Sequence, residues 1–66
     1  MEYTGMKQIF AGISKDCDDW QVWQSEAGDD LCVVIRNQSD HDRRFFVVGV
    51  KKTEKALELA KKHCVA

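Results

Sequence analysis

Four apolar runs separated by short polar segments occupy residues 6–50. They span Met6 to Ile13, Trp20 to Ser25, Leu31 to Asn37 and Arg43 to Val50, and most are rich in the β-branched and aromatic residues that strands favour. The separators, such as Glu-Ala-Gly-Asp-Asp, are turn-forming segments. Because connections this short usually join antiparallel neighbours, the pattern predicts a three- to four-stranded antiparallel meander.

The last apolar pattern has helical spacing. Thr53 is expected to cap the N-terminus of a helix that runs to about Cys64, with Glu54 in its first turn. One stripe of this helix is apolar: Ala56, Leu57, Leu59, Ala60, His63 and Cys64. We therefore expect an α+β fold, a single domain of residues 1–66, with one C-terminal helix packed on one face of the sheet (ββββα).

Alternation along the strands assigns side chains to two faces of the sheet. The face toward the helix is expected to carry Ile9, Ala11, Ile13, Trp20, Val22, Leu31, Val33, Ile35, Phe46, Val48 and Val50. The opposite face is expected to carry Gln8, Phe10, Gln21, Trp23, Cys32, Val34, Arg36, Phe45 and Val47.

The opposite face is unusually apolar for a face that meets water. Trp20 and Trp23 are three positions apart, so a regular strand points them to opposite sides. Soluble monomers rarely expose large apolar patches without a use. We interpret the patch as a contact surface for a protein partner or a second copy, formed by Trp23, Phe10, Phe45 and Val34. Alternatively, the N-terminal tail with Tyr3 and Met6 covers it, or a bulge in the second strand puts both tryptophans on one side.

Acidic residues gather in the turns. In a meander, the first and third turns lie at the same end of the sheet, which would bring together Asp16, Asp18, Asp19, Asp40 and Asp42. They are interpreted either as solvated turn residues or as an acidic surface that docks on a basic partner, including one that normally holds nucleic acid. The returning helix C-terminus suggests a third alternative, a metal site made of Cys17, His41, His63 and Cys64. Its spacing matches no standard zinc pattern, and no cofactor is predicted.

Composition narrows the function classes. A net charge of −1 gives no global attraction for nucleic acid. A small nucleic-acid-binding module that uses the sheet aromatics with Arg36, Arg43 and Arg44 stays an alternative. His63 and Cys64 are adjacent on the helix and cannot face each other, so we do not expect an enzyme. The sequence shows neither a membrane span nor a signal-peptide pattern, which predicts a cytosolic protein.

The C-terminal third resembles the strand-to-helix half of small bacterial and phage domains. The resemblance is carried by Thr53, Ala56, Leu57 and Ala60, which follow the strand Arg-Arg-Phe-Phe-Val-Val-Gly-Val. With its small size and acidic turns, the chain also resembles phage-encoded accessory proteins, including anti-CRISPR inhibitors. The resemblance implies a non-enzymatic inhibitor or adaptor that acts on a protein partner, such as a nucleic-acid-binding complex, in the cytosol of the host cell.

Overall fold

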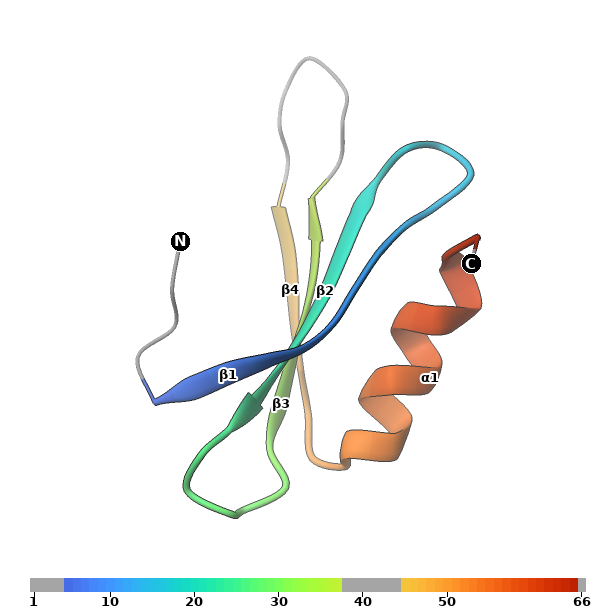
Figure 1. Cartoon of the computed structure of the whole chain (residues 1–66). Helices are drawn as coiled ribbons and strands as arrows, with labels where there is room; N and C mark the ends of the chain where they lie inside the picture. Colours follow the sequence, from blue (N-terminus) through green and yellow to red (C-terminus); the bar gives the residue numbers. More distant parts are fainter. Residues whose placement is uncertain (1–4, 38–44, 66) are drawn as a thin grey trace.

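The fold is a four-stranded antiparallel sheet followed by one helix (Figure 1). The computed structural model describes residues 5–37 and 45–65, and of Phe45 and Phe46 it describes the backbone alone. The strands are β1 (Met6–Ile13), β2 (Asp19–Ser25), β3 (Cys32–Asn37) and β4 (Phe45–Val50), and the helix is α1 (Thr53–His63). The strand order β1-β2-β3-β4 is the predicted meander, so the predicted ββββα fold class is confirmed.

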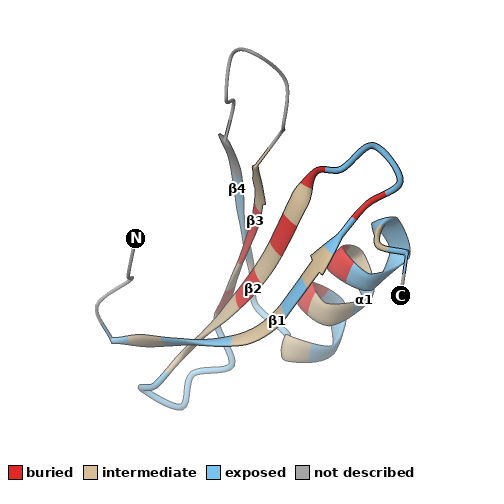
Figure 2. Cartoon of the chain, turned by 45° about the horizontal axis from the view of Figure 1, so that its top comes forward, coloured by how far each residue is buried: buried red, intermediate tan, exposed pale blue. Residues whose placement is uncertain are grey.

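Helix α1 covers one face of the sheet, and most of the buried residues lie where they meet (Figure 2). The core consists of Trp20, Val22, Cys32, Val34, Ala56 and Ala60. Two alanines on the inner side of α1 let the helix backbone approach the strands closely, while Leu57 and Leu59 pack at the margins. Within residues 5–37 and 45–65, no helix has the length and apolar character needed to cross a membrane.

The predicted faces are correct for β2 and wrong for β3. Val22 pairs directly with Val34, and Gln24 pairs with Cys32. Directly paired residues share a face of the sheet. Val34 and Cys32 therefore face α1, and the predicted set Leu31, Val33 and Ile35 does not. The run from Leu31 to Ile35 is apolar at every position, so alternation alone could not select its inward face.

The predicted faces of the β1 side chains are wrong in part, because this strand contains a bulge. The register with β2 shifts between Gln8 and Phe10, and both Ile9 and Phe10 pack against the core. The register of β2 with β3 is unbroken from Asp19 to Gln24. The alternative of a bulge in β2 is therefore wrong, and Trp20 and Trp23 lie on opposite faces as predicted.

The N-terminus of α1 is capped by a distant turn rather than by Thr53. Lys52 occupies the cap position without a side-chain cap, and Thr53 is the first helical residue. The backbone N–H and hydroxyl of Thr53 both donate to Oδ1 of Asp30, in the β2–β3 turn. A carboxylate here satisfies free N–H groups and favours the positive end of the helix dipole. The turn thus ties α1 to the sheet.

Asp30 is expected to make part of the stability dependent on pH. Hydrogen bonds from Thr53 lower the pKa of Asp30 below its usual 3.8, and Lys52 lowers it further. Because the folded-state pKa is the lower one, the cap contributes stability above 3.8, and this contribution is lost as pH falls through the folded-state value. Asp30→Asn keeps a side chain that tolerates the left-handed φ of +56°. We expect a lower melting temperature than wild type at neutral pH and convergence of the two in acid. If Asp30→Asn lowered the melting temperature by the same amount at all pH values, Asp30 would not be the source of the pH dependence. An equal effect of the control Glu26→Gln would contradict the role of Asp30 in the same way.

Candidate functional site

The face opposite α1 carries two uncharged rows of side chains across all four strands. One row is Gln8, Trp23, Val33 and Gly49, and the other is Ala11, Gln21, Ile35 and Val47. We call these eight residues the open face. Antiparallel sheets that meet water usually place polar residues there. In the open face the larger side chains of β2 to β4 are mainly apolar and the polar ones are neutral, while the charged Asp19 lies in the adjoining row of the same side.

Trp23 is held in a defined direction on the open face. Its indole Nε1 donates to Oε1 of Gln21 at 2.9 Å, and Nε2 of Gln21 donates to Oδ2 of Asp19 at 3.1 Å. The ring therefore leans along β2 toward the row that contains Ile35. Ile35 is buried, although it lies outside the core cluster under α1. Trp23 is half-buried, and Val47 is 55% exposed. A preorganised tryptophan beside an exposed valine makes a suitable anchor for an interface.

Two residues that we predicted on this face lie on the other side. Val34 is 2% exposed and belongs to the core under α1. Phe10 packs against the same core, with the Lys61 ammonium 5.9 Å from its ring centre. Their placement beside Trp23 was wrong for the register reasons given above. The side chain of Phe45 lies outside the described residues, as does Tyr3 of the alternative in which the tail covers the face.

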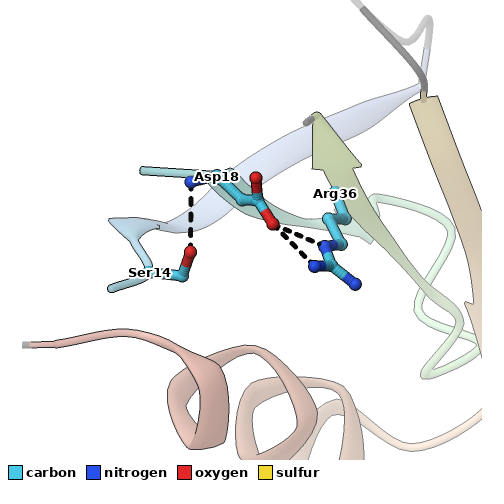
Figure 3. A network of polar contacts seen from close by, with 3 residues as sticks. All are labelled: Ser14, Asp18 and Arg36. Carbon is cyan, nitrogen blue, oxygen red and sulfur yellow. Dashed lines mark hydrogen bonds and ion pairs between the residues drawn. The ribbon is translucent and has the colours of Figure 1, made fainter. Parts of the chain in front are cut away.

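The predicted acidic cluster contains an internal ion pair. Nε and Nη2 of Arg36 donate to Oδ2 of Asp18 at 2.9 and 2.6 Å (Figure 3). The Asp18 backbone N–H donates to Oγ of Ser14 at 3.1 Å, which fixes the β1–β2 turn. Asp18 is buried, so its charge is balanced within the fold and does not face a partner. Asp16 is exposed and Asp19 is half-buried, whereas Asp40 and Asp42 lie outside the described residues.

Aromatic stacking extends this ion pair to the helix. The Arg36 guanidinium lies over the Trp20 ring, 5.4 Å from its centre. Trp20 stacks on His63, with ring centres 4.7 Å apart and planes within 3°. The layers Arg36, Trp20 and His63 thus join β3, β2 and the C-terminal turn of α1. Sequence reasoning placed His63 at this end correctly but missed the stack, because it depends on the register between β2 and β3.

The Asp18–Arg36 pair is expected to stabilise the fold measurably. Hydrogen bonds to a charged group contribute about 2 kcal/mol, so Arg36→Ala should lower the free energy of unfolding by about that amount. A double-mutant cycle with Asp18→Asn, measured by chemical denaturation, isolates the pair from the stacking on Trp20. Additive effects of the two single changes would show that the pair contributes nothing.

The metal alternative finds no support in the described part of the chain. Among residues 5–37 and 45–65, no group of three or more His, Cys, Asp or Glu side chains could hold a metal ion. His63 is engaged with Trp20, and His41 lies outside the described residues. Burial, with the nearby Asp19 carboxylate, raises the pKa of the Cys64 thiol. A protonated thiol is a weak metal ligand and a weak nucleophile. The expectation that the protein is not an enzyme stays a prediction.

Comparisons with protein families, with characterised proteins and with solved structures give no match to this chain. The resemblance to phage-encoded accessory proteins therefore stays a prediction. The interpretation of the site depends on the geometry of the chain itself.

Proposed function

We propose that this chain is a non-enzymatic protein-interaction module, an inhibitor or adaptor, that works as a dimer through the open face. The observation that carries the proposal is the uncharged, largely apolar surface around Trp23 on a sheet face that α1 does not cover. On this surface Val47 is exposed and Trp23 and Val33 are half-buried, and accessible apolar surface favours association with another protein. Among the described residues, the acidic contribution would come from Asp16 and Asp19 at the margin, since Asp18 is paired with Arg36.

A second copy is the partner that fits the open face. Neither row contains a charged residue, and the charged Asp19 lies in the next row at one end of the same face. Two copies can therefore meet over the open face without like charges facing each other. Two sheets that pack face to face bury their inner side chains in a common layer about 10 Å thick. The dimer would then have a helix on each outer side and two sheets between. Trp23 of each copy would fill the central layer.

The nucleic-acid alternative is less well supported, because its parts lie on different faces. A stacking platform needs aromatic rings and cationic groups on one surface. Trp23 is on the open face, whereas Arg36 lies over Trp20 on the helix side and is bound to Asp18. Arg43 and Arg44 lie outside the described residues.

The molar mass in solution tests this proposal. The chain has a mass of 7.6 kDa, and light scattering after size-exclusion chromatography should give about twice that value at micromolar concentration. A monomer mass over the whole accessible concentration range would remove the dimer. A mobility shift with short single-stranded DNA or RNA at low salt, weakening steeply as salt rises, would favour the alternative instead.

A further inference from the structure

Strand β4 forms one edge of the four-stranded sheet. It pairs with β3 in an unbroken register from Phe45 to Val50. Every second residue of an edge strand points its N–H and C=O away from the sheet. In the described part of the chain, no backbone hydrogen bond joins β4 to a segment other than β3. The strand contains neither a charged residue nor proline.

The opposite edge, β1, is protected by contrast. It carries a bulge between Gln8 and Phe10 and an exposed lysine, Lys7. The chain after α1 closes one end of the strand: Ser14 forms a bridge with Cys64, and the Val65 N–H donates to the Ile13 carbonyl at 3.0 Å. Bulges, lysines and covering segments are the usual means of preventing strand addition. Between its ends, the described part of β4 contains no bulge and no lysine, and no described segment covers it.

Both faces beside the β4 edge also have room for a neighbour. Val47 on the open face is 55% exposed, and Val48 on the helix side is 49% exposed, because α1 packs mainly against β2 and β3. Gly49 is exposed as well. An added strand could therefore place its alternate side chains against Val47 on one face and Val48 on the other.

The charges around β4 decide which strand fits. Lys51 and Lys52 follow it and are exposed, and Arg43 and Arg44 precede it in the sequence. A second copy that paired along β4 in parallel would bring Lys51 and Lys52 next to their counterparts, which is destabilising. A strand with acidic residues at its ends would form favourable pairs at the same positions.

We propose that β4 is a docking edge for an extended segment of another protein, in which acidic residues flank a short run of β-branched residues. The segment adds as a fifth strand, held by backbone hydrogen bonds and selected by its flanking charges. This inference goes beyond the open face, because two copies that pack face to face leave their sheet edges free.

The test measures binding of the probe fluorescein-Gly-Glu-Glu-Val-Thr-Val-Thr-Val-Glu-Glu-amide, labelled at its N-terminus, by fluorescence polarisation. The expected dissociation constant is below about 1 mM. Replacing the four Glu residues with Lys should abolish binding. Lys51→Glu with Lys52→Glu should weaken binding of the acidic probe about tenfold or more. The matched control is Lys7→Glu with Lys15→Glu, which makes the same charge change away from β4 and should have less than about a twofold effect. Circular dichroism checks that both variants fold.

Two further measurements test strand addition itself. Methylation of alternate backbone N–H groups along one edge of the probe should abolish binding, and methylation along the other edge should not, because an added strand uses one edge only. Amide hydrogen exchange in residues 45–50 should slow on binding. Trp23→Ala should leave probe binding unchanged, which separates this proposal from that of the open face. Absence of binding at about 1 mM, equal binding of the Lys-flanked probe, or equal losses in the two charge variants would overturn the proposal.

Discussion

Replacing Trp23 with alanine is expected to dissociate the proposed dimer while the monomer keeps its fold. Aromatic anchors near the centre of an interface typically contribute 2 kcal/mol or more, so the dissociation constant should rise by about thirtyfold or more. The fold should persist because Trp23 lies outside the core cluster under α1. Sedimentation equilibrium over a concentration series measures the constant, and circular dichroism reports the fold.

Two controls make this result specific. Trp23→Phe keeps a ring but loses the bond from Nε1 to Gln21, and it should weaken the dimer less than alanine does. Val48→Ala removes an exposed apolar group from the helix side of the sheet and should leave the constant unchanged. If Trp23→Ala and wild type share one dissociation constant, the open face is not the interface.

Introducing a charge at Val34 is expected to prevent folding, whereas the same change one residue earlier should be tolerated. Val34 is 2% exposed in the core, and an unpaired buried carboxylate costs several kcal/mol. A domain of this length has a total stability of about 5 kcal/mol, so Val34→Asp should be largely unfolded at room temperature. Val33→Asp places its carboxylate on the open face and should cost about 1 kcal/mol in the monomer.

Urea denaturation followed by circular dichroism compares these two variants. The dimer contributes to the apparent stability of wild type, so the Trp23→Ala background is the proper reference for both. If Val33→Asp were the unfolded variant and Val34→Asp the folded one, the register of β3 would be reversed. Trp23 and Val34 would then share a face, as the alternation first suggested.

The elements of this fold could be predicted from the sequence because each has a local signal. Turn residues separate the strands, and the helix formers after Thr53 differ clearly from the β-branched runs. Alternation in β2 was also informative, since the polar Gln21 separates Trp20 and Val22, which both face α1. The inward face of β3 could not be obtained in this way, because Leu31 to Ile35 is apolar throughout.

The contacts that position the candidate site depend on long-range register. Asp30 caps a helix that begins at Thr53, and Asp18 pairs with Arg36 across two strands. Neither partner is close in sequence, so propensity and spacing could not identify them. The bulge beside Ile9 could not be predicted from local sequence either, since it depends on how β1 pairs with β2. Trp23 was assigned correctly to the face away from α1, because that assignment needed only the parity of one strand.

The most direct test of the interface uses two neighbouring valines of β4. Val47 and Val48 are similarly exposed, at 55% and 49%, and they lie on opposite faces of the sheet. Glutamate at either position makes the same change in net charge, and light scattering gives the molar mass of each variant. Our account predicts that Val47→Glu is a monomer, because its carboxylate would enter the layer between two sheets, and that Val48→Glu stays a dimer. Equal masses for the two variants, or dissociation by Val48→Glu alone, would contradict the assignment of the open face as the interaction surface.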